Sequence, residues 1–467
     1  MDSVGRGVAR LSPRPRNLTI VPAAPFRFID LFAGIGGFHA ALSAYGGRCV
    51  YAVEIDKRAA DIYALNWGLD AFGDITHDAN DDVLKVPAHE VLVAGFPCQP
   101  FSKSGAQRGM DETRGTLYWN ILRIIQGRKP KVVILENVRN IAGPRHMHEW
   151  QVIIETLRDE GYRVSETPAI FSPHLLPPDR GGRPQVRERV FITATHNPEG
   201  IGDGLPVEPP VSAADIVDGW QPKEEWHLED LLDNSHNIPG CELTDTERVW
   251  IDAWNEFVEI MWEARQGRRL PGFPIWADSW HDYRLPIPAG TPDWKASHLR
   301  KNYELYAAHK ATLDDWADKW GVFTDAFPPS RRKLEWQAQD TPRLWDTVMH
   351  FRPSGIRAKR PTYLPALVAI TQTSIVGPRE RRLSPREAAR LQGLPDWFDF
   401  ADQPPSATYK QLGNGVNVGA VWHVFREHVR RDEDILKRTP AGRRILETVL
   451  AAPKSPDGVL ADMPRHG

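Results

Sequence analysis

The fold class of this chain is decided by the stretch Val91-Leu92-Val93-Ala94-Gly95-Phe96-Pro97-Cys98-Gln99-Pro100-Phe101-Ser102. A short apolar run ends at Gly95, and a thiol then stands between two prolines at the start of a loop. Parallel α/β sheets present reactive groups in this way, at the carboxyl ends of their strands. Most free cysteines are buried structural residues, but the prolines and the polar residues that follow favour an exposed position here. We therefore predict that Cys98 is a nucleophile whose thiol is activated by its surroundings.

The sequence on either side of this stretch continues the same pattern. Apolar segments of strand length alternate with helical patterns, which predicts a doubly wound, mostly parallel α/β sheet with helices on both faces. The clearest strands are Phe28–Phe32, Cys49–Glu54, Val91–Ala94, Val132–Leu135 and Val190–Thr195. The helical patterns between them include Gly37–Ala44, Lys57–Asn66 and Leu117–Gln126.

The pattern changes after Asn197, which predicts a second, smaller module. Residues 226–350 carry eleven of the seventeen tryptophans, and they include charged helical stretches at Thr244–Gln266 and His298–Trp320. Tryptophans at such density usually form a core, and the segment is too long to be a loop. The expected division is a flexible lead at 1–25, a catalytic and cofactor-binding domain at 26–197 and 376–435, an inserted domain at 198–375, and a polar tail at 436–467.

Composition restricts the possible functions. The chain has 467 residues, of which 41% are hydrophobic, so it can form a packed core. Its net charge of −3 means that a nucleic-acid partner would need a local basic surface. The cysteines, Cys49, Cys98 and Cys241, are widely spaced and form no CxxC pair, which argues against disulfides or a metal site. No apolar stretch has the roughly 18 residues of a membrane helix, and no signal peptide is evident, so we expect a cytoplasmic protein without a membrane partner.

A cofactor site is predicted at the first strand. The segment Phe28-Ile29-Asp30-Leu31-Phe32-Ala33-Gly34-Ile35-Gly36-Gly37-Phe38 reads as a strand, a glycine turn and a helix. Glu54 ends the next strand, where an acid can accept hydrogen bonds from ribose hydroxyls, and Asp74 could accept one from an adenine amino group. The turn lacks the G-x-G-x-x-G spacing of dinucleotide-binding proteins. The residues by themselves therefore indicate a nucleoside-bearing cofactor and leave NAD and S-adenosylmethionine open.

Further reactive groups are expected at the edge of the sheet that carries Cys98. Glu136 and Asn137 directly follow the strand Val132–Leu135. Gln185, Arg187 and Arg189 alternate along one extended segment, so their side chains should share a face. A thiol, a carboxyl and two guanidinium groups can thus converge, although the arginines could instead form a surface salt-bridge cluster.

Nine motifs in one order make the chain resemble the cytosine-5 DNA methyltransferases. They are Phe32-Ala33-Gly34-Ile35-Gly36-Gly37, Glu54, Gly73-Asp74-Ile75, Gly95–Ser102, Arg114–Leu117, Glu136–Val138, Gln185–Val190, Arg382–Gly393 and Gln411–Gly415. The resemblance covers residues 26–196 and about 378–430. The long gap between these segments is where the family places its variable target-recognition domain.

The resemblance implies a fold, a cofactor and a reaction. It implies the S-adenosylmethionine-dependent methyltransferase fold and methylation of a cytosine that is flipped out of double-stranded DNA. Cys98 would attack C6 of the base, Glu136 as a protonated acid would donate to N3, and Arg189 would hold O2 with Arg187 nearby. The positions expected around S-adenosyl-L-methionine are Phe32, Gly34, Gly36, Glu54, Asp74, Ile75, Leu117 and Asn414.

DNA contacts are predicted in two places. The resemblance puts Ser104 in the space that the flipped base leaves. The basic string from Arg352 to Arg360 is a candidate DNA-contacting loop, since phosphate contacts come mainly from arginine and lysine. Its candidate residues are Arg352, Arg357, Lys359 and Arg360, and the alternative is a solvated basic loop.

Several functions compete with sequence-specific DNA methylation. A related tRNA methyltransferase usually has a second proline where this chain has Phe96, and also a Cys-Phe-Thr string that is absent here. A catalytically inactive DNA-binding homologue is disfavoured because every matched catalytic position is intact. An NAD-dependent oxidoreductase is disfavoured because the glycine turn does not have the G-x-G-x-x-G spacing of dinucleotide-binding proteins. The size of the chain suits a monomeric prokaryotic or viral enzyme that protects DNA from a cognate restriction endonuclease.

Overall fold

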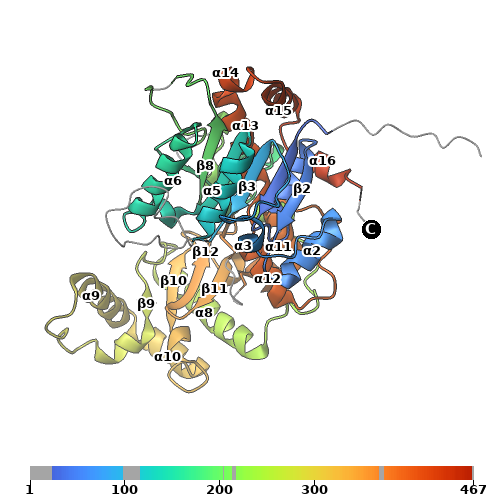
Figure 1. Cartoon of the computed structure of the whole chain (residues 1–467). Coiled ribbons are helices and arrows are strands. Elements are labelled where there is room, and N and C mark those ends of the chain that lie inside the picture. The colour runs from blue at the N-terminus through green and yellow to red at the C-terminus, as the bar shows by residue number, and fades with distance from the viewer. Residues whose placement is uncertain (1–23, 98–115, 203, 213–216, 368–372, 465–467) are drawn as a thin grey trace, which may run out of the picture.

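The structure is a computed structural model that describes residues 24–97, 116–202, 204–212, 217–367 and 373–464. Two parts are visible in Figure 1, a larger α/β part and a smaller part that contains α8, α9 and α10. The predicted nucleophile Cys98, the predicted DNA-contacting Ser104 and nearly all of the expected flexible lead lie outside the described residues.

The larger part is built on a seven-stranded sheet with the order β2-β1-β3-β4-β8-β5, in which β6 also pairs with β8. Strands β1 to β4 are parallel, and β8 runs antiparallel to β4, β5 and β6. The strand bounds are β1 Arg27–Leu31, β2 Arg48–Val53, β3 Val91–Gly95, β4 Val132–Val138, β5 Tyr162–Val164, β6 Ala169–Phe171 and β8 Arg189–His196. All five strands predicted from the sequence are present, each within three residues of its expected ends.

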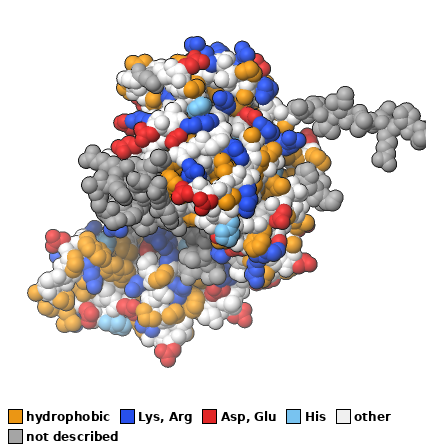
Figure 2. All heavy atoms as spheres, viewed as in Figure 1, with side chains coloured by type: hydrophobic (Ala, Val, Ile, Leu, Met, Phe, Trp, Pro, Cys, Tyr) orange, Lys and Arg blue, Asp and Glu red, His pale blue; other side chains and the backbone are white. Residues whose placement is uncertain are grey.

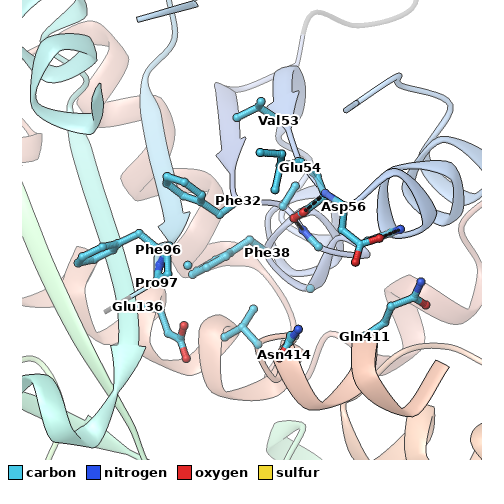
Figure 3. Close-up of a pocket in the computed structure, with 18 of the residues that line it drawn as sticks. Phe32, Phe38, Val53, Glu54, Asp56, Phe96, Pro97, Glu136, Gln411 and Asn414 are labelled. Carbon is cyan, nitrogen blue, oxygen red and sulfur yellow. Dashed lines mark hydrogen bonds between the residues drawn. The ribbon is translucent and has the colours of Figure 1, made fainter. Parts of the chain in front are cut away.

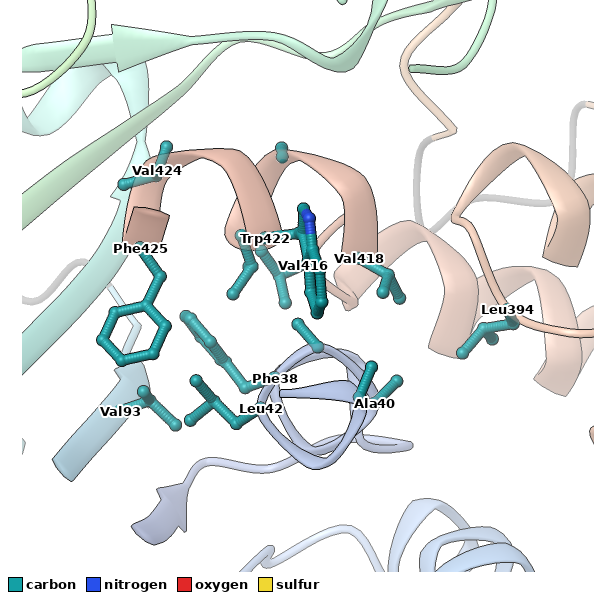
Figure 4. Close-up of a cluster of buried hydrophobic side chains, with 14 of the residues drawn as sticks. Phe38, Ala40, Leu42, Val93, Leu394, Val416, Val418, Trp422, Val424 and Phe425 are labelled. Carbon is teal, nitrogen blue, oxygen red and sulfur yellow. The ribbon is translucent and has the colours of Figure 1, made fainter. Parts of the chain in front are cut away.

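Helices cover both faces of this sheet, as the alternating pattern predicts. Phe28 and Val93 pack on one face against α1 and α13, while Ile29 and Leu92 pack on the other against α5 and α6. Figure 4 shows Phe38 and Leu42 of α1 facing Trp422 and Phe425 of α13 beside Val93. The helices of this part are α1 Gly37–Ala44, α2 Lys57–Trp67, α3 Ile75–Asp78, α5 Leu117–Arg128, α6 Met147–Asp159, α11 Pro385–Leu391, α12 Pro405–Asn414, α13 Val418–Arg431, α14 Glu433–Leu436, α15 Pro440–Ala451 and α16 Asp457–Ala461. The predicted doubly wound α/β fold is confirmed.

The C-terminal segment differs from the polar tail that the sequence suggests. Helices α15 and α16 bury Ile445, Leu446, Val449 and Leu460 in the same core as α1 and α13. The indole of Trp397 donates a hydrogen bond to the carbonyl of Leu460 at 2.7 Å. The segment is polar in composition, but its few apolar residues are spaced so that they lie on one side of the helices. These residues pack the segment against the catalytic part.

The smaller part has its own sheet and its own core. Its sheet has the order β15-β14-β11-β12-β10-β9, and its core contains Trp254, Trp280, Trp316 and Trp336. The elements are α8 Asp245–Ala264, β9 Ile275–Trp276, α9 Asp293–Ala308, α10 Lys310–Trp320, β10 Lys333–Gln337, β11 Val348–Arg352, β12 Gly355–Lys359, β14 Ile375–Val376 and β15 Arg381–Arg382. The predicted stretch His298–Trp320 is therefore two helices that meet at His309, and the sheet continues past residue 375 to Arg382. Helix α7 (Pro222–Glu225) lies beside the larger part, because the indoles of Trp220 and Trp226 on either side of it both donate to the carbonyl of His174.

The two parts meet where the chain returns from the insertion to the catalytic sheet. Strand β13 (Leu364–Pro365) pairs in parallel with β7 (Gln185–Val186), with Leu364 opposite Gln185. Strand β7 directly precedes the predicted catalytic arginines. Among the described helices, none is both long and apolar enough to cross a membrane.

Candidate active site

A cavity of about 550 Å³ lies at the carboxyl ends of the parallel strands (Figure 3). Seven of the eight residues predicted around the cofactor line it, together with Glu136 and Arg189 of the predicted catalytic set. The seven are Phe32, Gly34, Glu54, Asp74, Ile75, Leu117 and Asn414. Segments that are distant in the sequence therefore meet around one space, as strand ends in a parallel sheet do.

The glycine turn and Glu54 form one wall of the cavity. The backbone of Phe32, Gly34 and Gly36 has positive φ angles of 57°, 55° and 93°. A side chain at Gly34 would meet no atom within 4 Å, so the turn opens towards free space. The N–H of Gly34 donates to Oε2 of Glu54 at 2.8 Å, and the N–H of Asp56 donates to its Oε1 at 2.8 Å. These bonds hold the carboxylate of Glu54 in place beside the turn.

Gly36, the eighth residue expected around the cofactor, does not line the cavity. A Cβ atom at this position would lie 2.2 Å from Nε1 of Trp67. The indole N–H of Trp67 donates to the carbonyl of Ile35 at 3.0 Å. Gly36 therefore allows α1 to begin in close contact with α2, and its effect on a cofactor would be indirect.

Two further acids at the cavity begin helices. Asp74 caps α3 by accepting hydrogen bonds from the N–H and the hydroxyl of Thr76, and these bonds lower the pKa of the Asp74 carboxyl. Asp56 caps α2 and forms an ion pair with Lys410 of α12 at 3.3 Å. The sequence prediction omitted Asp56, although an acid just before a helical pattern is a cap signal that could have revealed it.

The residues of this end of the cavity fit S-adenosyl-L-methionine. Carboxylates can accept hydrogen bonds from ribose hydroxyls and from amino groups. Apolar side chains of Phe32, Val53 and Ile75 can contact an adenine ring. Ile55 also lines the cavity although it is 71% exposed, and nothing in its local sequence distinguishes it from an ordinary surface residue.

The opposite end of the cavity holds Glu136 and Arg189. Strands β4 and β8 are neighbours, and they bring Nε of Arg189 to 2.9 Å from Oε1 of Glu136. Burial raises the pKa of the Glu136 carboxyl, while the positive charges of Arg189 and Arg187 oppose this shift in part. Glu136 is therefore more easily protonated than an exposed glutamate, which suits an acid that donates a proton.

The strand that leads to Cys98 is fixed beside this pair. Gly95 of β3 lies opposite Glu136 of β4, and the side-chain amide of Asn137 donates to the carbonyl of Phe96 at 2.9 Å. Pro97, the residue before Cys98 in the sequence, lines the cavity.

Arg187 does not join Arg189 at the cavity, contrary to the expectation that the two side chains share a face. Strand β7 ends at Val186 and β8 begins at Arg189, so the segment is not one continuous strand. The guanidinium of Arg187 is buried and donates to the carbonyls of Leu367, Gly413 and Gly415 at 2.6–3.1 Å. Burial lowers the pKa of Arg187 to about 9, which leaves it charged at neutral pH. It connects β7 to the segment that carries Asn414.

The basic string of the insertion forms part of a hairpin and not a loop. Arg352 ends β11, and Arg357 and Lys359 lie on β12. Arg357 pairs with Glu335 of β10 at 2.6 Å, and Arg360 pairs with Asp340. None of these residues lines the cavity. In the described part of the chain, no cluster of three or more His, Cys, Asp or Glu side chains could hold a metal ion.

The chain is similar to known DNA methyltransferases. The family model for C-5 cytosine-specific DNA methylases matches residues 26–430. The type II methyltransferase M.AluI of Cellulosimicrobium cellulans is 55% identical over 92% of this chain and 96% of that protein. The type II methyltransferase M.HgiBI of Herpetosiphon aurantiacus is 42% identical over 84% of this chain and 94% of that protein. The matches span both segments of the α/β part and the insertion between them.

Proposed function

Because the chain belongs to the family of C-5 cytosine-specific DNA methylases, we propose that it methylates cytosine in one particular double-stranded DNA sequence and protects that sequence from a partner restriction endonuclease. The relatives that match it over most of their length are named type II methyltransferases, which supports this biological role. The enzyme would act as a cytoplasmic monomer, with S-adenosyl-L-methionine as its methyl donor.

One observation carries this proposal. A single cavity contains both the acids suited to a nucleoside, Glu54 and Asp74, and the Glu136–Arg189 pair suited to a pyrimidine. S-adenosyl-L-methionine supplies an electrophilic methyl group when it is bound at the first end. A cytosine at the second end would then present its ring to that group, provided that the base leaves the duplex stack.

The residues of the second end would activate the ring in steps. The thiolate of Cys98 attacks C6, which forms a carbon–sulfur bond and pushes electron density towards C5 and N3. Glu136, whose pKa is raised by burial, donates a proton to N3 and so neutralises the developing charge. The guanidinium of Arg189 orients Glu136 and hydrogen-bonds to O2 of the base.

Methylation and release complete the proposed cycle. C5 takes the methyl group and then loses its proton to a base, for which a water molecule is suitable. The electron pair of the broken C5–H bond restores the C5–C6 double bond, and the thiolate of Cys98 leaves C6. N3 returns its proton to the carboxylate of Glu136, which leaves neutral 5-methylcytosine and restores the acid. Exclusion of bulk water from the cavity would protect the intermediate.

The insertion would choose the DNA sequence. The alignment with M.AluI covers 92% of this chain. The part left uncovered is much shorter than the insertion, so the alignment includes most of the insertion. We therefore infer that the two proteins share a target sequence. Methylation sequencing of DNA from cells that express the chain identifies the modified site, and a site different from that of M.AluI would contradict this part of the proposal.

The covalent step is tested with the variant Cys98→Ser and with 5-fluorocytosine. We expect the variant to lose methyl transfer and to keep its affinity for S-adenosyl-L-methionine, since Glu54 and Asp74 are unchanged. Duplexes with 5-fluorocytosine at the target should trap the wild-type enzyme, because fluorine is not removed as a proton is. Mass spectrometry should find the adduct on Cys98, and a fully active serine variant would disprove the mechanism.

A further inference from the structure

One face of three strands in the insertion carries partly buried, mostly basic side chains. We call this the basic sheet face and define it as Glu335, His350, Arg352, Arg357 and Lys359. In the register of the sheet, Arg357 of β12 lies between Glu335 of β10 and His350 of β11. The alternate residues of these strands point to the opposite side and are buried in the tryptophan-rich core, including Leu334, Ile356 and Ala358. The basic sheet face is therefore the side of these strands that remains available to a partner.

The position of this face relative to the active site suits contact with the substrate. Lys359 ends β12, and five residues later Leu364 pairs with Gln185 at the start of the catalytic arginine segment. Five extended residues span at most about 17 Å, which is comparable with the roughly 12 Å width of the DNA major groove. Figure 2 shows lysine and arginine side chains in the recess between the two parts of the molecule.

Glu335 organises the face. Its Oε1 accepts a hydrogen bond from the hydroxyl of Ser354 at 2.8 Å, and its Oε2 accepts one from Nε of Arg357 at 2.6 Å. The Nη2 atom of Arg357 also lies 2.6 Å from Oε2 of Glu335, whereas Nη1 of Arg352 is 4.0 Å away. Glu335 is only 16% exposed, so Arg357 is held by a fixed carboxylate on its Nε–Nη2 edge.

This arrangement leaves the other edge of the guanidinium free. A guanidinium has two edges that can each donate a pair of parallel hydrogen bonds, and Glu335 faces one of them. No described residue accepts a hydrogen bond from Nη1 of Arg357, and its side chain is 30% exposed. An arginine fixed on one edge loses little conformational freedom when its free edge binds a planar acceptor pair.

We propose that Arg357, oriented by Glu335, reads a guanine of the target sequence through its O6 and N7 atoms in the major groove. Paired with arginine, these two acceptors form the commonest specific contact between proteins and DNA. Arg352, whose Nη1 lies at the limit of ion pairing with Glu335, and Lys359, for which the described residues form no ion pair, flank Arg357 and would contact phosphates. This inference rests on the proposed function, because it names the residue that would read the sequence methylated at the active site.

The test uses DNA in which single guanines are replaced by 7-deazaguanine, which lacks the N7 acceptor. After methylation sequencing has identified the target, each guanine of a synthetic duplex is replaced in turn, and kcat/KM is measured for wild type and Arg357→Ala. At one guanine, we expect the replacement to lower the wild-type kcat/KM roughly 5-fold, the lower end of what a complete bidentate contact contributes, because the O6 acceptor remains. The same replacement should have little further effect on Arg357→Ala.

Two more variants make the result specific. Glu335→Gln should keep the fold and weaken discrimination at the same guanine, since a neutral amide orients the guanidinium less firmly. Arg343→Ala serves as the control, because Arg343 pairs with Asp346 at 2.7 Å in the same module but outside the sheet strands. In Arg343→Ala, 7-deazaguanine should lower kcat/KM by the same factor as in the wild type.

The outcomes separate this inference from the proposed function. If Arg357→Ala weakens binding to all sequences, reduces the salt dependence and keeps every 7-deazaguanine penalty, then Arg357 contacts phosphate and the inference is wrong. The inference is also wrong if Arg343→Ala abolishes the effect of 7-deazaguanine on kcat/KM to the same extent as Arg357→Ala does. Product analysis that finds no 5-methylcytosine with the wild-type enzyme would instead refute the proposed function itself.

Discussion

At the scale of single residues, Glu136 shows how environment gives a common side chain a special task. It ends a buried strand beside Arg189, and burial raises its pKa while the arginine charges limit that rise. We expect Glu136→Gln to slow methyl transfer in a single turnover by about 10²- to 10⁴-fold, because glutamine can hydrogen-bond to N3 but cannot deliver a proton. DNA affinity should change far less.

The rate of methyl transfer by the wild-type enzyme should depend on pH through the protonation of Glu136. A raised carboxyl pKa means that the protonated, active form is lost as the pH rises through that value, so the wild-type single-turnover rate should fall on the alkaline side. The variant should lack this dependence. Glu166→Gln is a matched control, since Glu166 is 75% exposed and pairs with Arg158 away from the cavity. A wild-type rate in Glu136→Gln would remove this residue from the mechanism.

At the scale of elements, Arg187 joins three segments that are far apart in the sequence. Its guanidinium donates to the carbonyls of Leu367, Gly413 and Gly415, and Asn414 at the cavity lies between the two glycines. Arg187→Ala leaves buried carbonyls without donors, so we expect it to lower the free energy of unfolding by about 3 kcal/mol. It should also weaken binding of S-adenosyl-L-methionine. Denaturant unfolding and calorimetry measure both effects, and a variant of unchanged stability that only loses catalytic rate would support direct contact of Arg187 with the base instead.

At the scale of the whole molecule, we expect the stability in acid to depend on a buried contact between the sheet and helix α13. Thr195 of β8 donates its hydroxyl proton to Asp432 at 2.7 Å, so its oxygen accepts the Nε2 proton of His428 at 2.9 Å. Nδ1 of His428 accepts from Arg431 at 3.1 Å, which requires a neutral ring. Burial lowers the pKa of His428 to about 3.

The sign of the pH effect follows from this shift. The unfolded chain binds a proton at His428 near its ordinary pKa of about 6.5, whereas the folded chain does not, so the free energy of unfolding should fall as the pH drops from 6.5 towards 3. His428→Gln can keep both hydrogen bonds without titrating. We expect this variant to reduce the slope of unfolding free energy against pH by about 1.4 kcal/mol per pH unit between pH 6 and 4. Equal slopes in both proteins would place the titrating group elsewhere, for example at His89 or His174, whose pKa values burial lowers to about 4.

The sequence by itself determined the α/β fold, the enzyme family and the cofactor class, and the comparisons confirm these predictions. The reason is that strand periodicity and motif order are local properties of the chain. Turn glycines, acids at strand ends and the Pro-Cys pair each carry their meaning within a few residues. The assignment of Cys98 as nucleophile stays a prediction, as do the roles of the residues around the cavity.

Only the tertiary structure decided which side chains meet. The spacing of Arg187 and Arg189 predicts one face, yet the interruption between β7 and β8 directs one to the backbone of Gly413 and Gly415 and the other to Glu136. Gly36 matches a cofactor motif, but its neighbour is Trp67. Glu335 lies 22 residues before Arg357 and becomes its partner through strand pairing. Such contacts depend on the packing of distant segments, and no local pattern of residues encodes them.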